Sequence, residues 1–364
     1  MAVAALALAP ADDSQTPGDG TTSTPAEAAA TTAAAAAVTA EPLRFDEPEE
    51  VRGIHVDYGT AADSDEMNAI LAAADPDAGL NAIQLDVKDE RGRIGIPMKL
   101  AAARRAKAVD PAYDAAKLVK RAHEAGLYTI ARVVAFQDPL YASAAKGPAL
   151  DRKGGGVWEN DLGLGWIDPT DKRAQDYVIA VARAAADAGF DEIMFDYVRF
   201  PTDGAVEDAV YSRPNASKDK TIAAFLDRAG QVLRPEGVKV SAAIFGIQAT
   251  SQADIGQDPA LLKNVLDAIA PMVYPSHFGS GQFDIDNPTA NPYDTVTASL
   301  LDWQKWVVNG RARLRPWLQD FAYNGVTYGT AEVEAQIRAA RDLHTDGFLL
   351  WNISGDYSPG TLMP

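Results

Sequence analysis

The stretch Gly189-Phe-Asp-Glu-Ile-Met-Phe-Asp-Tyr-Val-Arg-Phe-Pro201 decides how the chain folds. It begins at a glycine of the kind that ends helices, continues as an apolar strand and stops at a proline. Asp196 and Arg199 stand at the carboxyl end of this strand. Because burying a carboxylate in an apolar strand is costly, Asp196 belongs either to a structural ion pair or to a functional site.

This stretch is one copy of a unit that recurs along the chain, in which an apolar strand is followed by a loop, an alanine-rich helix and a glycine. Further strands are predicted over 52–57, 81–88, 128–136, 238–245, 268–274, 313–319 and 348–352. Strands that alternate with helices pair in parallel, and eight units predict an α/β fold, the closed (β/α)8 TIM barrel. An open doubly wound sheet is the alternative, but no G-x-G-x-x-G motif follows the first strand.

The predicted strand-to-helix loops are long, whereas the helix-to-strand links are short and centred on glycine. In barrels the strand-to-helix loops form the face that carries active sites. The aromatic residues in these loops are Trp158, Trp166, Tyr211, Phe278, Phe283 and Tyr293. Exposed aromatic rings around a cleft suit stacking on sugar rings, and the alternative is that they pack the loops together.

Alternation along the strands predicts which side chains point into the barrel. The predicted inward-facing residues are His55, Asp57, Gln84, Asp86, Lys88, Arg132, Met194, Asp196 and Val198. A purely structural barrel interior prefers branched apolar residues. So many ionisable groups therefore indicate a functional cluster, with a buried salt-bridge network as the alternative.

Two positioned carboxylates can cleave a glycosidic bond, as acid with nucleophile or as acid with base. The candidate catalytic residues, in order of preference, are Asp196, Asp86 and Asp89. The candidate substrate-binding residues are Asp57, Arg132, Tyr197, Arg199, Tyr274, His277, Gln319, Asp320, Trp351, Trp158 and Trp166. The expected ligand is an oligosaccharide or polysaccharide. The carboxyl separation, and with it a retaining or inverting outcome, stays open.

Composition excludes several other classes of function. The 364 residues carry a formal net charge of -18, which disfavours nucleic acid as a partner. The sequence has no cysteine, and its four histidines lie on separate elements, so neither a metal site nor a cofactor is predicted. No apolar run is long enough for a transmembrane segment. We expect a monomer.

The chain divides into a tail, residues 1–48, and a barrel domain, residues 49–364. The tail is of low complexity and is predicted to be disordered. Its start, Met1–Pro10, is apolar like the core of a signal peptide but lacks a basic segment. This favours export to the periplasm or the cell exterior, and the alternative is an alanine-rich disordered tail.

Several motifs resemble a bacterial glycosyl hydrolase family, the domain of unknown function 4015. They are Leu85–Gly92, Ile130–Asp138, Phe190–Pro201, Pro271–His277, Arg315–Phe321 and Leu349–Asn352. The resemblance covers about 51–357 and implies a glycosidase-type TIM barrel, often exported. In this family the fifth strand often carries an acid, where this chain has Ala242 and Ala243. A carbohydrate-binding barrel without turnover and a tethered interaction protein therefore remain alternatives to a glycoside hydrolase.

Overall fold

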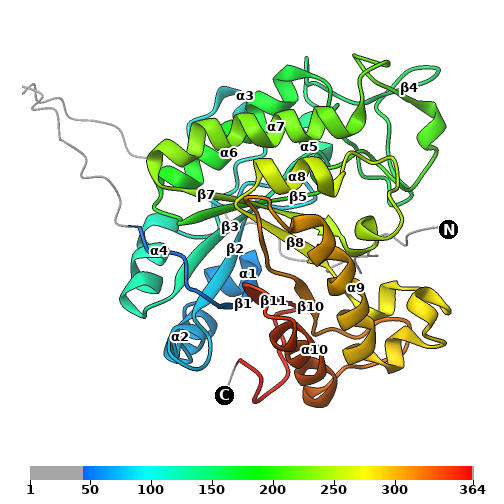
Figure 1. The fold of residues 1–364 in the computed structure, drawn as a ribbon. Helices are drawn as coiled ribbons and strands as arrows, with labels where there is room; N and C mark the ends of the chain where they lie inside the picture. The colour runs from blue at the N-terminus through cyan, green and yellow to red at the C-terminus, as the bar shows by residue number, and fades with distance from the viewer. Residues whose placement is uncertain (1–43, 363–364) are drawn as a thin grey trace, which may run out of the picture.

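The computed structural model describes residues 44–362, whose centre is a closed barrel of parallel strands (Figure 1). The barrel strands are β1 (Val51–Val56), β2 (Ala82–Lys88), β3 (Tyr128–Val134), β5 (Glu192–Asp196), β7 (Lys239–Phe245), β8 (Ala268–Met272), β9 (Arg313–Leu314) with β10 (Trp317–Gln319), and β11 (Gly347–Trp351). β9 and β10 share the seventh position and are separated by Arg315 and Pro316. β11 pairs with β1, and β10 pairs with both β8 and β11, which closes the ring. The prediction of a (β/α)8 TIM barrel is confirmed.

Helices surround the barrel strands (Figure 1). They are α1 (Tyr58–Ala62), α2 (Ser64–Ala72), α3 (Ala101–Arg105), α4 (Ala115–Glu124), α5 (Pro139–Ala142), α6 (Lys172–Asp187), α7 (Lys218–Leu233), α8 (Pro259–Val265), α9 (Pro292–Val307) and α10 (Thr330–Asp342). Asp171 caps the start of the long helix α6, and its side chain accepts a hydrogen bond from the Arg173 amide. The helix is followed by Gly189 at φ +104°, a conformation that side chains disfavour. Across residues 44–362, no helix combines the length and apolar character needed to cross a membrane.

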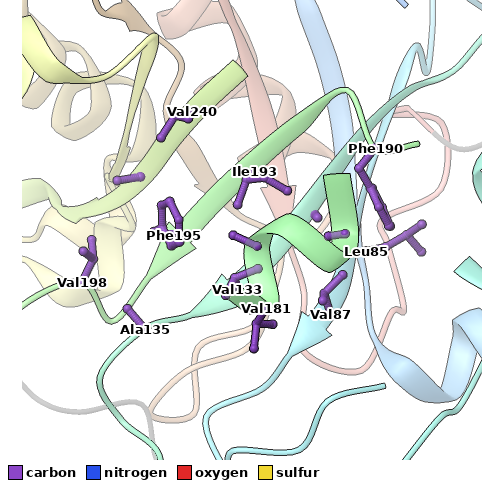
Figure 2. Packing of buried hydrophobic residues seen from close by; sticks show 14 of the residues in the cluster. Leu85, Val87, Val133, Ala135, Val181, Phe190, Ile193, Phe195, Val198 and Val240 are labelled. Carbon is purple, nitrogen blue, oxygen red and sulfur yellow. The ribbon is translucent and has the colours of Figure 1, made fainter. Parts of the chain in front are cut away.

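The alternation of β5 separates two apolar clusters. Ile193 and Phe195 face outward and pack with Val133 of β3 and Val181 of α6 (Figure 2). Met194 faces inward and belongs to a second cluster, inside the barrel. This arrangement follows from the pleat, which sends successive side chains to opposite faces of the sheet.

The alternation stops at Tyr197, and the prediction that Val198 faces the interior is wrong. Tyr197 has φ +45°, a left-handed conformation that is unusual for a residue with a side chain. β5 has ended by this point, and Val198 packs in the outer cluster instead. Backbone strain of this kind concentrates at functional sites because the surrounding structure has to hold it.

A buried ionic network lies among the barrel strands near their amino ends. Glu192, the first residue of β5, accepts two hydrogen bonds from Nη2 of Arg315, at 2.7 and 2.8 Å. The hydroxyl groups of Tyr128 and Ser241 also donate to Glu192. This part of the interior is therefore a structural salt-bridge network, in which Nε and Nη1 of Arg315 have no hydrogen-bond partner among residues 44–362.

Residues 44–50 pack against this end of the barrel. Arg44 donates hydrogen bonds to backbone carbonyl groups of Ala186, Phe190 and Glu236. Phe45 stacks on the ring of His123, with ring centroids 4.3 Å apart. The predicted tail therefore makes barrel contacts from residue 44, four residues before its predicted end. The rest of that tail, with the signal-like start Met1–Pro10, lies outside the described residues.

Two of the long strand-to-helix loops are joined by a small antiparallel sheet. It consists of β4 (Asp151–Arg152) and β6 (Ala209–Val210). Trp158 Nε1 adds a hydrogen bond of 2.8 Å to the Ala205 carbonyl group. The loops that follow β3 and β5 therefore form one wall above the barrel.

Candidate functional site

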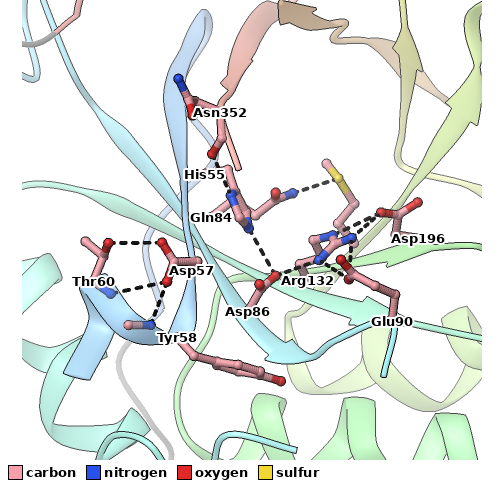
Figure 3. A network of polar contacts seen from close by, with 12 residues as sticks. His55, Asp57, Tyr58, Thr60, Gln84, Asp86, Glu90, Arg132, Asp196 and Asn352 are labelled. Carbon is pink, nitrogen blue, oxygen red and sulfur yellow. Dashed lines mark hydrogen bonds and ion pairs between the residues drawn. The ribbon is translucent and has the colours of Figure 1, made fainter. Parts of the chain in front are cut away.

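Arg132 is the centre of a cluster of carboxylates at the carboxyl ends of the strands (Figure 3). Its guanidinium donates to Asp86 Oδ1 at 2.9 Å and to Asp196 Oδ2 from Nε at 3.0 Å and from Nη2 at 2.8 Å. Both Nη atoms also lie 3.3 Å from Glu90 Oε2. The three carboxylates outweigh the effect of burial and raise the pKa of Arg132 well above its ordinary value.

Asp196 is held at both of its carboxylate oxygens. Oδ2 accepts the two hydrogen bonds from Arg132, and Oδ1 accepts one of 2.7 Å from the backbone amide of Tyr197. An oxygen pair that only accepts hydrogen bonds is the arrangement of a carboxylate anion. The left-handed conformation of Tyr197 places this amide beside the carboxylate. Asp196 is only 4% exposed.

Asp86 lies behind Arg132 and is bound from two sides. Nε2 of His55 is 3.1 Å from Asp86 Oδ1, and Arg132 occupies the other side (Figure 3). Burial alone would raise the pKa of Asp86, but Arg132 and His55 outweigh it and lower that pKa to about 2. Both contacts are made by Oδ1, so this carboxylate orients Arg132 and His55.

A cavity of about 580 Å³ opens above this cluster. Its charged and polar lining includes Glu90, Arg132, Asp196, Arg199, Asp203, Tyr274 and His277. Its aromatic lining includes Tyr197, Phe245, Phe278, Trp317 and Trp351. A mainly apolar cavity with a few convergent polar groups is the usual form of a small-molecule site. It lies where the barrel architecture predicts an active site.

The structure brings seven of the fourteen predicted site residues to this cavity, namely Arg132, Asp196, Tyr197, Arg199, Tyr274, His277 and Trp351. Trp351 lies beneath the Arg132 guanidinium, 5.0 Å from it, and stacks on Trp317 at 4.7 Å. The hydroxyl group of Tyr274 is buried and has no hydrogen-bond partner among residues 44–362. Burial lowers the pKa of His277 to about 4, so its ring is neutral at pH 7.

Asp57 and Asp89 do not reach the cavity, because each carboxylate caps a turn of its own backbone. Asp57 was expected to point inward but begins helix α1, accepting hydrogen bonds from Gly59 and Thr60 (Figure 3). Asp89 accepts from the amides of the turn at 91–93. Burial, together with the nearby charge of Glu90, raises the pKa of Asp89 to about 6.

Gln319 and Asp320 are likewise used within the fold and do not line the cavity. Gln319 accepts a hydrogen bond from the Ser276 amide and donates to the Phe321 carbonyl group. Asp320 accepts from both the hydroxyl and the amide of Ser358, at 2.6 and 2.9 Å. These two residues therefore hold the loops around the cavity in place but do not line it.

Trp158 and Trp166 lie inside the loop wall, where they are 1% and 0% exposed. Of the two alternatives for these rings, sugar platforms and packing of the loops against one another, their burial supports the second. Their rings meet edge to face at 6.4 Å, and Trp166 also stacks against Arg199. They are buried because the loops after β3 and β5 fold onto each other, which loop composition does not reveal.

Two carboxylates that line the cavity, Glu90 and Asp203, were missed by the sequence reasoning. Glu90 has the same strand parity as Asp86 and Lys88, so continuing the alternation would have selected it in place of Asp89. Asp203 lies in the loop after β5, and both of its carboxylate oxygens are buried without a hydrogen-bond partner in the described chain. No sequence pattern marks Asp203.

Within residues 44–362, no three His, Asp or Glu side chains are arranged to hold a metal ion. The fifth barrel strand, β7, places Ala243 at the cavity and Ala242 in the outer cluster. This strand therefore contributes no carboxylate to the site.

The fold is similar to that of several solved glycoside hydrolase domains. The PgaB (BpsB) glycoside hydrolase domain from Bordetella bronchiseptica aligns at 14% identity and TM-score 0.61, over 83% of this chain and 94% of that chain. The C-terminal domain of a putative chitinase from Desulfitobacterium hafniense aligns at 13% identity and TM-score 0.53, over 83% and 93%. The GH36 alpha-galactosidase AgaA from Geobacillus stearothermophilus aligns at 12% identity and TM-score 0.51, over 84% and 39%. At such identities the likeness concerns the fold.

No curated protein matches the sequence. Residues 53–357 match the family described as "Putative glycosyl hydrolase domain". This range begins within β1 and ends beyond β11, so it includes nearly the whole barrel and every residue that lines the cavity. The chain therefore belongs to this putative glycosyl hydrolase family, the domain of unknown function 4015.

Proposed function

We propose that the chain hydrolyses a glycosidic bond of a glycan bound in the cavity, with Asp196 as the reacting carboxylate. The observation that carries the proposal is the geometry of Asp196. It lines the cavity, Arg132 holds one of its oxygens and the Tyr197 amide holds the other. A carboxylate fixed in this way can attack the sugar as a nucleophile or activate a water molecule as a base.

Glycosidic cleavage also needs a group that donates a proton to the leaving oxygen. Asp86 does not suit this role, because it is bound by Arg132 and His55 and does not line the cavity. Glu90 and Asp203 both line the cavity, and Asp203 makes no hydrogen bond within the described chain. We propose that one of these two carboxyl groups is the proton donor.

The first experiment tests Asp196 on a panel of glycans, with release of reducing ends as the measurement. We expect Asp196→Asn to lower hydrolysis about 10³-fold or more, as loss of a catalytic nucleophile does in other enzymes. Asp187→Asn, at an exposed position on α6, is the matched control. Thermal melting of both variants shows whether the fold is kept. Full hydrolysis by a folded Asp196→Asn variant would contradict the proposal.

The second experiment assigns the proton donor with Glu90→Gln and Asp203→Asn. An aryl glycoside with a good leaving group needs little protonation. Loss of the proton donor should therefore lower the rate of hydrolysis strongly for natural glycans and much less for the aryl glycoside. The variant with this selective loss identifies the donor, and similar losses on both substrates for both variants would exclude the two residues.

A binding barrel without turnover is the second candidate, and the absence of a carboxylate on β7 favours it. Ala243 lines the cavity at the position where the strand could have presented an acid. Saturable glycan binding without any new reducing ends over long incubation would support this candidate. Export of the chain remains a separate proposal, which rests on the apolar start Met1–Pro10 alone.

A further inference from the structure

Arg199 is a second buried guanidinium at the cavity, in surroundings different from those of Arg132. It lines the cavity and is 4% exposed. Three aromatic rings surround its guanidinium, those of Phe245 at 4.7 Å, Trp166 at 5.1 Å and Tyr197 at 5.3 Å. Contacts of this type hold the flat faces of a guanidinium and leave its N–H edge for hydrogen bonds.

The N–H edge of Arg199 is largely unused by the protein. Its hydrogen bond within residues 44–362 runs from Nη1 to the Phe200 carbonyl group, at 3.0 Å, and it forms no salt bridge there. Arg132, which is equally buried, is bonded by three carboxylates. A buried charge without a partner is costly, and burial lowers the pKa of Arg199. An acceptor that enters the cavity would offset this cost.

Asp203 also lines the cavity but does not neutralise Arg199. Its charge acts on the guanidinium, yet it forms no ion pair with it, and both of its oxygens lack a hydrogen-bond partner in the described chain. The space between an unpaired guanidinium and an unpaired carboxylate can hold a group of a ligand. A guanidinium edge matches a carboxylate, which it binds through two parallel hydrogen bonds.

We propose, on the basis of the glycosidase function proposed above, that Arg199 binds the carboxylate of a hexuronate residue, so that the substrate is an acidic glycan. The aromatic rings fix the guanidinium plane, and the carboxylate of the sugar lies in that plane against the free N–H edge. Asp203 accepts hydrogen bonds from hydroxyl groups of the same or the neighbouring sugar.

The net charge of the chain makes this preference a strict test of the local site. A chain with formal charge -18 repels anions over a distance. Stronger binding of an acidic sugar than of its neutral ester therefore cannot come from the overall field. It has to come from a cation in contact with the ligand.

The probes are the methyl glycosides of glucuronic acid and galacturonic acid, each compared with its own methyl ester. The ester keeps the ring and removes the charge. Titration of the full chain, followed by ligand-observed NMR, gives the two dissociation constants. We expect at least one acid to bind about tenfold more tightly than its ester, the scale of one charge-assisted hydrogen bond. Equal binding of acid and ester, or no binding of either acid, would overturn the proposal.

Three variants assign the preference to Arg199. Arg199→Gln should abolish the preference for the acid over the ester. Arg199→Lys should keep part of it, since lysine keeps the charge but lacks the two parallel N–H groups of a guanidinium. Arg183→Gln, at an exposed arginine on α6, is the control and should behave as the wild type. A preference unchanged in a folded Arg199→Gln variant would overturn the assignment.

Asp203→Asn distinguishes this proposal from the alternative that the site binds only sugar hydroxyl groups. If Arg199 binds a carboxylate, Asp203→Asn should leave the preference for the acid at least as large as in the wild type, and about threefold larger where Asp203 is ionised, because the variant then loses a repelling charge. If the two residues together clamp hydroxyl groups, binding of acid and ester should fall by the same factor, which would overturn the proposal.

The proposal and the glycosidase function fail in different ways. If the chain hydrolyses neutral glycans and shows no preference for acid over ester, the glycosidase function stands and the hexuronate proposal is refuted. If the chain binds a hexuronate through Arg199 but hydrolyses no uronate-containing glycan, the binding proposal stands and the glycosidase function is refuted.

Discussion

Arg132 donates two hydrogen bonds to a single oxygen of Asp196, from Nε at 3.0 Å and from Nη2 at 2.8 Å. The same guanidinium reaches back to Asp86 at 2.9 Å. Arg132 thus ties three adjacent strands, β2, β3 and β5, at their carboxyl ends. The bonds that orient the reacting carboxylate are the same bonds that neutralise the interior of the barrel, so site geometry and stability depend on each other.

We expect Arg132→Met to lower the free energy of unfolding by about 3–5 kcal/mol, because it leaves three carboxylates in a buried site without a cation. Urea denaturation at pH 7 measures the change. Adding Asp86→Asn to the variant should restore part of the loss, because it removes one of the repelling charges. Arg183→Met on the surface is the control. A loss below about 1 kcal/mol would show that water or a rearrangement compensates the charges.

The low pKa of Asp86 predicts a loss of stability in acid. Burial opposes the shift, but Arg132 and His55 hold the folded pKa at about 2, below the ordinary value of 3.8. The stabilisation from Asp86 is therefore complete above about pH 4 and is lost as the pH falls toward 2. By linkage it amounts to about 2 kcal/mol. Urea denaturation across this range should show a smaller acid loss for Asp86→Asn than for the wild type, and an identical loss would refute the assignment.

Tyr274→Phe separates a functional hydroxyl group from a structural one. The Tyr274 hydroxyl is buried at the cavity without a hydrogen-bond partner among residues 44–362. Its removal should therefore change stability by less than about 0.5 kcal/mol, while glycan affinity falls about 3- to 10-fold. Tyr113→Phe is the matched control, because that buried hydroxyl donates to the Asp86 carbonyl group at 2.7 Å. It should lower stability by about 1–2 kcal/mol. The reverse pattern would make Tyr274 a packing residue.

Arg44→Ala tests the contacts that residues 44–50 make with the barrel. The side chain donates to the carbonyl groups of Ala186 and Phe190, which precede strand β5, and to that of Glu236. We expect a loss of about 1–3 kcal/mol in the free energy of unfolding, since hydrogen bonds from a charged donor are stronger than neutral ones. Arg183→Ala, at an exposed arginine on α6, should change stability by less than about 0.5 kcal/mol. Equal effects of the two variants would show that Arg44 contributes no more than a surface residue.

The inward positions of Asp86, Arg132 and Asp196 were predictable because a strand alternates strictly, and the outward apolar residues reveal which side faces the helices. The same rule fails where the strand ends. Asp57 caps a helix, and Val198 follows the left-handed Tyr197. At strand ends, local hydrogen bonds determine the direction of a side chain, and the alternation along the strand no longer applies.

By itself, the sequence determined the barrel, its eight strand positions and the inward direction of Asp86, Arg132 and Asp196. These follow from periodicity and from glycines at helix ends, which act over a few residues. Only the tertiary structure decided that Arg132 holds Asp86, Glu90 and Asp196 together and that Trp158 and Trp166 are buried. The contacts that determine these features join segments far apart in the chain, and their distances depend on how the long loops fold on one another.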